Sequence, residues 1–217
     1  MQLVLNLQQE RDFRWQGFAQ GATNQEALSW LKNWPYWPTY GVVIYGPACS
    51  GKTHLGRLWQ EGSGAHLLKP QDQNTPPLAL ASLPILIDGF SDMPWDEDWL
   101  FHFLNARFNT QARILILDRA PPCAWPVKKP DVRSRCLVLP SVGIHAPDET
   151  FIEAFLIALF RERGVTLSQG VARFLSIRLE RCYATILQMV EHLNACSLRL
   201  SRPITVPFLK EIGGIEG

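Results

Sequence analysis

Several patterns that would quickly assign a protein to a class are absent from these 217 residues. The five cysteines include no CxxC pair and their number is odd, so neither a disulfide framework nor a zinc site is indicated. The charges nearly cancel, at +1, which argues against strong nonspecific binding to the DNA backbone. The longest apolar helix candidate, residues 151–160, is too short to span a bilayer, and no signal-peptide pattern opens the chain. We therefore expect a soluble, cytoplasmic protein.

Short apolar runs of strand length occur through the first two thirds of the chain. They are AHLLK (65–69, the weakest), GVVIYG (41–46), LPILIDG (83–89), RILILD (113–118) and RCLVLP (135–140). Continuous runs of Ile, Val and Leu are typical of strands buried on both faces, as in a parallel sheet. Helical segments lie between them, such as EALSWLKNW (26–34) and WDEDWLFHFLNARF (95–108). This alternation predicts a layered α/β domain.

The pattern changes near residue 147, after which no strand-like run remains. The helical candidates there are DETFIEAFLIALFRERG, SQGVARFLSIRLE, YATILQMVEHLNACSLRL and a short VPFLKEIGG. Acidic residues open the first of them, and arginines with a glycine close it, as expected at helix ends. These segments predict a small all-helical domain of three or four helices.

The stretch GPACSGKT (46–53) fits the phosphate-loop pattern GxxxxGK[ST] without a mismatch. It follows a predicted strand and leads into a predicted helix, which is the context that this motif needs. Backbone N–H groups of such a loop point at phosphates, Lys52 reaches the β- and γ-phosphates, and Thr53 can ligate Mg²⁺. The predicted nucleotide contacts here are Gly46, Pro47, Ala48, Cys49, Ser50, Gly51, Lys52, Thr53 and His54.

A Walker B carboxylate should end a neighbouring apolar strand, and Asp88 ends ILID. Asp88 would join Thr53 in the Mg²⁺ shell, although a simple strand-end acid is the alternative. Enzymes of this kind that hydrolyse ATP commonly carry a second carboxylate at the next position, where this chain has Gly89. The sequence therefore predicts nucleotide binding more firmly than hydrolysis.

Two further polar segments follow the next strands. Asp118 ends RILILD, where its side chain can face the γ-phosphate, unless Asp118 and Arg119 are only loop charges. The segment DVRSR (131–135) offers two arginines beside the sheet edge. Either could pair with an acid of its own fold or reach a nucleotide held by a neighbouring subunit, as an arginine finger does. Both interpretations stay open at this point.

This order of motifs resembles the AAA+ core of the DnaA-related family, and most closely its Hda branch. The matching stretches are FAQGATNQEAL (18–28, with Ala19 at the nucleotide pocket), GPACSGKTHL, WLFHFLNARF, DRAPP, VRSR and RPITVPFLKEI (202–212). The resemblance implies an AAA+ P-loop NTPase core, a parallel sheet flanked by helices, followed by a small helical lid. The implied divisions are 1–12 for an N-terminal peptide, 13–146 for the core and 147–217 for the lid.

The resemblance also explains the apolar start, MQLVLNL. Hda-like proteins carry a short sliding-clamp-binding peptide there, and Gln2, Leu3, Leu5 and Leu7 match it. An extended peptide can lay alternate side chains into an apolar groove while its amides bond to the groove wall. The alternative is an edge strand on this protein's own sheet. No helix-turn-helix follows the lid, which favours an Hda-like protein over an initiator.

The resemblance implies a regulator of replication initiation that binds ADP or ATP with Mg²⁺. The clamp, the β subunit of DNA polymerase III, would recruit it, and Arg135 would act in trans on ATP bound to DnaA. DNA would be reached only through the clamp, at the nucleoid or replisome, with no membrane; a homodimer and Arg133 as the finger stay open.

One position departs from the family pattern, because Ala184 stands where the lid usually has a sensor-2 arginine. ADP or ATP preference is therefore open, and little or no ATPase activity of its own is expected. Two alternatives remain: a self-standing P-loop ATPase acting as loader or remodeller, and a DNA-binding accessory initiation factor.

Overall fold

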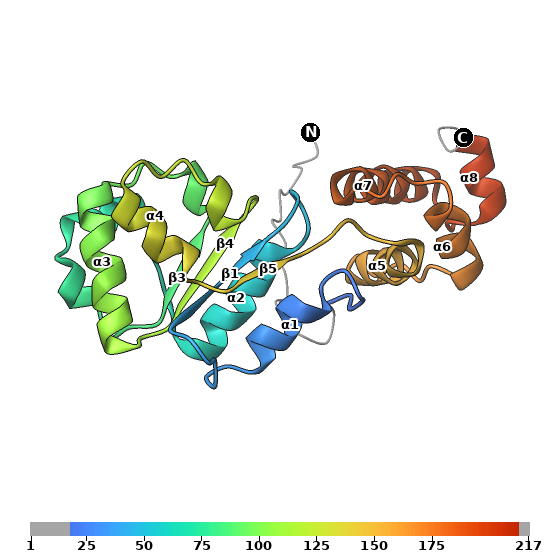
Figure 1. Ribbon diagram of the computed structural model, residues 1–217. Coiled ribbons are helices and arrows are strands. Elements are labelled where there is room, and N and C mark those ends of the chain that lie inside the picture. Colours follow the sequence, from blue (N-terminus) through green and yellow to red (C-terminus); the bar gives the residue numbers. More distant parts are fainter. Residues whose placement is uncertain (1–17, 213–217) are drawn as a thin grey trace, which may run out of the picture.

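The computed structural model describes residues 18–212. Figure 1 shows two lobes, a core built around a sheet and a bundle of helices formed by the C-terminal part of the chain. The predicted clamp-binding residues Gln2, Leu3, Leu5 and Leu7 lie outside the described residues, so that interpretation stays a prediction.

Five parallel strands form the sheet in the order β2-β3-β4-β1-β5. Their bounds are β1 Gly41–Tyr45, β2 His66–Leu67, β3 Ile85–Asp88, β4 Ile114–Asp118 and β5 Ser141–Gly143. The central strands are buried on both faces, because the residues of β4 are all buried and those of β1 nearly so. The predicted α/β class with a parallel sheet is confirmed.

Helices cover both faces of this sheet and give the core three layers (Figure 1). The core helices are α1 Gln25–Lys32, α2 Lys52–Ser63, α3 Glu97–Thr110 and α4 Pro130–Leu137, with short 3₁₀ helices η2 Pro70–Asn74, η3 Pro77–Leu80, η4 Phe90–Asp92 and η5 Pro122–Ala124. Val43 packs with α3 and α4, whereas Val42 and Ile44 pack with α1 and α2. Successive strand residues therefore point to opposite helical layers, as the pleat requires.

One predicted strand is wrong. RCLVLP (135–140) forms the last turn of α4 and the connection after it, and β5 begins only at Ser141. Pro130 stands at the first helical position, where its missing N–H is harmless, and the helix continues through the arginines. Cys136 and Leu139 are buried while Leu137 and Val138 are exposed, which is helical rather than strand burial.

The described part of the C-terminal lobe, up to Ile212, contains four helices, in agreement with the prediction of three or four. They are α5 Glu149–Glu162, α6 Gln169–Ser176, α7 Tyr183–Leu200 and α8 Val206–Ile212, and they enclose an apolar cluster of their own. The Asp148 carboxylate caps α5 by accepting from the Phe151 N–H at 2.7 Å, and Ser168 caps α6 in the same way. Within residues 18–212 no helix is long and apolar enough to cross a membrane.

Candidate functional site

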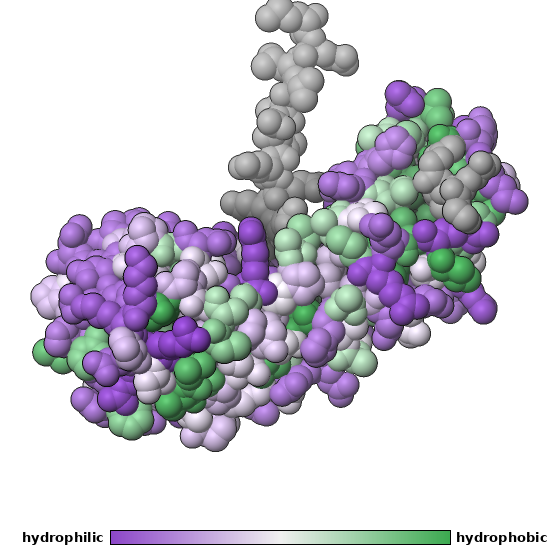
Figure 2. All heavy atoms as spheres, turned by 45° about the horizontal axis from the view of Figure 1, so that its top comes forward, coloured by the Kyte–Doolittle hydropathy of each residue, from purple (hydrophilic) through white to green (hydrophobic). Residues whose placement is uncertain are grey.

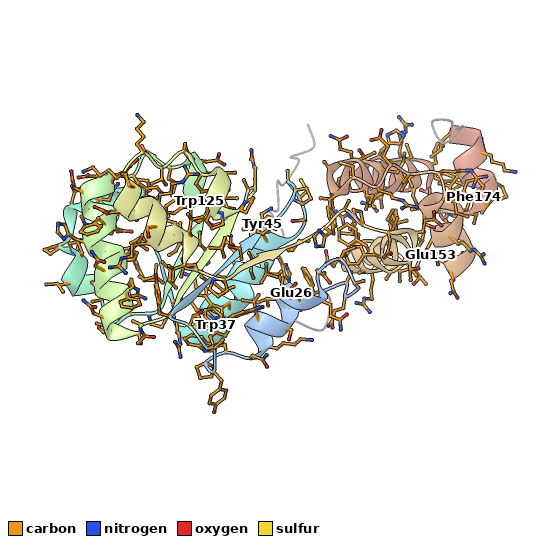
Figure 3. The ribbon with its side chains drawn as sticks, in the orientation of Figure 1. Glu26, Trp37, Tyr45, Trp125, Glu153 and Phe174 are labelled. Atoms are coloured by element: carbon orange, nitrogen blue, oxygen red, sulfur yellow. The ribbon has the colours of Figure 1, made fainter. Side chains whose placement is uncertain are left out.

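The phosphate loop lies where four parallel strands end. Tyr45, the last residue of β1, is level with Asp118 of β4 and Gly143 of β5, and Asp88 of β3 is level with Leu117. Figure 3 labels Tyr45 on the side of the core that faces the helical lobe. The loop that follows Tyr45 leads into α2, so its backbone N–H groups and the start of the helix lie together at this end of the sheet. In open α/β sheets, ligands bind at such carboxyl ends.

Lys52 is held inside this loop. Its Nζ donates to the carbonyl oxygens of Gly46 and Pro47, both at 2.8 Å, and to Ser50 Oγ at 3.3 Å. The side chain is only 9% exposed. Burial lowers the pKa of Lys52, Asp88 opposes that shift, and Arg119 adds to it. The ammonium group is therefore held by the loop carbonyls, which a phosphate oxygen could replace as its partner.

The two predicted Mg²⁺ ligands fit the ion by their chemistry. Asp88 ends β3, close enough to Lys52 to affect its pKa, and Thr53 lies in the first turn of α2. Neither side chain makes a hydrogen bond or ion pair with another residue in the described range 18–212. A carboxylate and a hydroxyl with free oxygen lone pairs are the hard ligands that Mg²⁺ prefers beside nucleotide phosphates. These two residues would hold the ion between β3 and α2.

The backbone conformation at position 89 gives a second reason for a glycine there, apart from the missing carboxylate. Its backbone is left-handed, with φ 84° and ψ 50°, and it starts the turn into η4. A side chain at this φ would be strained by about 1–2 kcal/mol. The sequence indicated only that an acid is absent here; the backbone adds that the chain turns in a way that glycine favours.

Asp118 ends β4 as predicted, and its carboxylate is engaged by neighbouring groups of the fold. Its carboxylate is 2% exposed and accepts four hydrogen bonds: from Ser91 N at 2.6 Å, Ser91 Oγ at 2.8 Å, Arg119 N at 2.6 Å and Ala120 N at 3.1 Å. Both oxygens are thus engaged inside the fold. This arrangement favours a role in fastening η4, just after Asp88, to the end of β4 over direct contact with a γ-phosphate.

The segment before α1 lies against the phosphate loop. The Phe18 ring is 5.2 Å from the His54 ring and stands beside Gly51. Asn24, fully buried, donates through Nδ2 to the Ala19 carbonyl at 2.9 Å and accepts from Gly21 N at 3.0 Å. Ala19 and His54 were among the predicted nucleotide contacts, whereas Phe18 and Asn24 were not. The signal for both was available in FAQGATN, which contains the two residues.

The same segment joins the core to the helical lobe. His145, in the link between β5 and α5, donates its N–H to the Thr23 carbonyl at 3.0 Å and accepts from the Tyr183 hydroxyl at 3.0 Å. The Tyr183 ring also packs edge-on against Phe151 of α5. Burial raises the pKa of Tyr183, so its hydroxyl stays protonated as the donor. One backbone position therefore connects the loop segment, the sheet and the start of α7.

The start of α7 carries no arginine aimed at the phosphate loop. Ala184 lies in its first turn, as predicted for the sensor-2 position. The nearby Arg181 forms an ion pair with Glu149 at 2.9 Å, and both side chains are largely exposed. An exposed pair of this kind contributes little stability, but it directs Arg181 toward α5.

The two arginines of VRSR differ in what they contact. Arg133 Nη2 donates to the Cys123 carbonyl at 3.1 Å, so it is tied to its own fold. The Arg135 guanidinium lies over the Phe108 ring, 5.2 Å from its centroid. Within residues 18–212, Arg135 donates no hydrogen bond and forms no ion pair. Its position near Tyr40, which directly precedes β1, places it at the amino ends of the strands.

Arg135 is therefore far from the phosphate loop of its own chain. The five residues of β1 separate the two ends of the sheet by about 16 Å. Arg135 cannot serve its own nucleotide, and its donors have no partner within residues 18–212.

Comparisons with known proteins agree with this architecture. Residues 148–212 match the family model described as "Hda, lid domain". Domain III of the DnaA replication initiation protein from Thermotoga maritima superposes with a TM-score of 0.71 at 15% identity, covering 90% of this chain and 93% of that one. The initiator DnaA bound to AMPPCP and single-stranded DNA gives 0.68 at 17% identity, covering 86% of this chain and 67% of that one.

The C-terminal lobe matches an Hda lid domain, and the fold of the chain is that of DnaA domain III. A protein of Haemophilus influenzae described as uncharacterized is 29% identical over 188 residues, which cover 78% of this chain and 79% of the relative. The helical lobe is thus an Hda lid domain, and the predicted AAA+ core with a helical lid is confirmed.

Proposed function

We propose that this Hda-like chain regulates replication initiation by stimulating ATP hydrolysis on DnaA, with Arg135 as an arginine finger in trans. The observation that carries the proposal is the position of Arg135 at the edge away from its own phosphate loop, with no donor used by another residue of the described range 18–212. A guanidinium delivered to a γ-phosphate stabilises the charge that develops in phosphoryl transfer.

The phosphate loop of this chain has a separate part in the proposal. Gly46–Thr53, with His54 and Ala19 beside it, binds ADP or ATP, while Thr53 and Asp88 hold Mg²⁺. Gly89 supplies no carboxylate to orient water, so we expect slow turnover or none at this site. Bound nucleotide instead stabilises the contact between the core and the Hda lid.

Recruitment is assigned to the N-terminal peptide. Gln2, Leu3, Leu5 and Leu7 would bind the sliding clamp on DNA and bring Arg135 near DnaA, so the chain touches DNA only through the clamp. The affinity of such a short peptide is modest, about micromolar, because ordering the peptide offsets much of the gain from buried leucines. Tethering then raises the local concentration of the finger.

The deciding test is ATP hydrolysis by DnaA in the presence of clamp loaded on DNA. The parent protein is expected to accelerate hydrolysis, Arg135→Ala to abolish the acceleration, and the triple change of Leu3, Leu5 and Leu7 to Ala to require far higher protein concentration. Arg133→Ala is the matched control, two residues away on the same helix, and should stay active. Equal loss in both arginine variants would reject the assignment of Arg135.

Two other functions are separated by the same reagents. A self-standing P-loop ATPase would turn over ATP without DnaA, and its rate would depend on Lys52 and not on Arg135. A DNA-binding accessory factor would bind DNA tightly without the clamp, and its affinity would fall steeply with salt.

A further inference from the structure

The support beneath Arg135 is an aromatic ring and not a carboxylate. Phe108 lies in the last turn of α3, with its ring 5.2 Å from the guanidinium carbon of Arg135. The Tyr40 ring meets Phe108 edge-on, with centroids 5.7 Å apart and planes at 88°. Tyr40 is itself part of the core cluster, so it fixes Phe108 from the inner side. The guanidinium therefore rests on a ring that the core holds in place.

The surface around this stack is open and apolar. Phe108 is 42% exposed, and Leu137 and Val138, which end α4, are more exposed still. Val138 lies three residues after Arg135, so the two share one side of the helix. Figure 2 shows hydrophobic side chains lying open on this lobe beside strongly hydrophilic ones.

Other arginine–aromatic stacks in the described residues differ from this one in a decisive way. Arg107 over Phe103, Arg178 over Phe174 and Arg202 over Phe208 each also donate hydrogen bonds to protein oxygens. The Arg135 guanidinium donates none within residues 18–212. An arginine carries five N–H donors, and an uncommitted set held in one plane matches a phosphate.

We propose that Phe108 is a positioning residue that holds the Arg135 guanidinium oriented for the triphosphate of a partner AAA+ subunit. This inference rests on the function proposed above and adds the residue on which the finger depends. A carboxylate in place of Phe108 would neutralise the charge and occupy the donors. An aromatic face restricts the rotamers of Arg135 and leaves every donor free for the partner.

The kinetic test compares Phe108→Leu with Phe108→Tyr in clamp-dependent stimulation of DnaA. Leucine keeps an apolar side chain without a ring, whereas tyrosine keeps the ring. We expect Phe108→Leu to lower the maximal stimulated rate about three- to tenfold, at an unchanged half-saturating concentration, and Phe108→Tyr to restore it. In the Arg135→Ala background, Phe108→Leu should have no further effect.

The control is Phe174→Leu in the lid, which removes the ring under Arg178. That stack is tighter, at 3.9 Å, and Figure 3 labels Phe174 on the lid, far from the core. It should leave stimulation unchanged. Thermal melting of each variant checks that the fold is kept.

A partner-free measurement separates this inference from the proposed function. The side-chain NMR resonances of Arg135 should be displaced by the ring current in the parent and in Phe108→Tyr, and should lose that displacement in Phe108→Leu, while Arg133 is unaffected. Unchanged Arg135 resonances in Phe108→Leu would overturn the stack.

The kinetic outcomes are also distinct. Full stimulation by Phe108→Leu together with an inactive Arg135→Ala would reject Phe108 as a positioning residue and leave the finger standing. If the parent protein does not accelerate ATP hydrolysis by DnaA, the proposed function and the triphosphate target are both rejected. The NMR resonances of Arg135 would then test the contact between Arg135 and Phe108 by themselves.

Discussion

The two ends of the sheet each present a cation, and the two cations are held in opposite ways. At the carboxyl ends of the strands, Lys52 donates three hydrogen bonds to its own loop and is nearly buried. At the amino ends, Arg135 lies over Phe108 and donates none within the described part of the chain. A cation satisfied by its own loop suits a site that waits for a ligand inside the fold. A cation with unused donors on the surface suits contact with another molecule.

Arg107 gives a third case, which shows what a purely structural arginine looks like in this fold. It is completely buried and donates to the carbonyl oxygens of Leu80, Leu83 and Arg113. Burial lowers its pKa to about 10, so it still carries its charge at neutral pH. These bonds connect α3 to the loop before β3 and to the start of β4. A structural arginine therefore differs from a functional one in this fold, because its guanidinium N–H groups already donate to oxygens of the protein.

The largest effect is expected from Arg107→Leu, which tests that distinction directly. Three buried carbonyl groups would lose their donor, at a cost of about 3–5 kcal/mol in the free energy of unfolding. For a chain of this size the melting temperature should fall by roughly 10 °C. Arg135→Ala should shift it by less than about 2 °C. Similar changes in melting temperature for Arg107→Leu and Arg135→Ala would contradict the distinction between a structural and a functional arginine.

The next largest effect is expected from Lys52→Ala at the phosphate-loop end. Loss of a charge-assisted contact to phosphate should weaken ADP or ATP binding about 10- to 100-fold, measured by titration with a fluorescent nucleotide. Lys210→Ala, on α8 of the lid, is the control and should bind normally. Arg135→Ala should also bind nucleotide normally, because it lies at the other end of the sheet. A weakened Arg135→Ala would contradict the separation of the two ends.

Each end of the sheet is predictable from the sequence to the extent that its structure depends on residues close together in the chain. The phosphate loop is one contiguous motif between a strand and a helix, so its residues and its place in the fold were both predictable. Strands 41–45, 85–88 and 114–118 were predictable because each is a continuous run of buried aliphatic residues. Asp118 was placed at the correct strand end, but its partner Ser91 is 27 residues away, and only the folded chain shows that the carboxylate is occupied.

The other end was less predictable because its local structure was misassigned. In a strand, Arg133 and Arg135 would point to the same face, since the side-chain period is two. In the helix α4 they lie about 200° apart, so one reaches Cys123 and the other Phe108. The contacts of the two candidate fingers, Arg133 and Arg135, therefore depend on a helix whose end was predicted as a strand from the apolar run RCLVLP. The β5 strand that follows has only three residues, too few to give a signal of its own.

A smaller effect is expected from Asp118→Asn, which tests whether this residue fastens the loop or contacts a phosphate. An amide cannot accept at both positions, so at least one of the bonds from Ser91 is lost, at a cost of about 1–2 kcal/mol. The melting temperature should fall by roughly 5 °C while nucleotide affinity changes less than threefold, a smaller change than for Lys52→Ala. Ser91→Ala should give part of the same loss of stability. A normal melt with a large loss of affinity would instead assign Asp118 to the nucleotide.

The smallest effect concerns Cys182, which starts the lid helix α7 beside the phosphate-loop end. Hydrogen bonds from the backbone N–H of Thr185, the Thr185 side chain and the backbone N–H of Ala184 lower the pKa of this exposed thiol. A lowered pKa means more thiolate at neutral pH, so alkylation by iodoacetamide at pH 7 should be a few-fold faster at Cys182 than at the exposed Cys123. The difference should shrink as the pH rises past the ordinary thiol pKa, because the lowered pKa of Cys182 then no longer gives it extra thiolate.

Thr185→Val is the matched change for this measurement, since it removes the hydroxyl, together with its hydrogen bond to the Glu180 carboxylate at 3.3 Å, and keeps the backbone N–H bonds. It should slow alkylation of Cys182 at pH 7 and leave Cys123 as it was, with site-resolved mass spectrometry as the readout. Equal rates at the two cysteines would show that the first turn of α7 is not formed as described. The same turn carries Tyr183, whose hydroxyl donates to the His145 carbonyl and connects the Hda lid to the core. Arg135→Ala should not alter the alkylation rate, because the two ends of the sheet act separately.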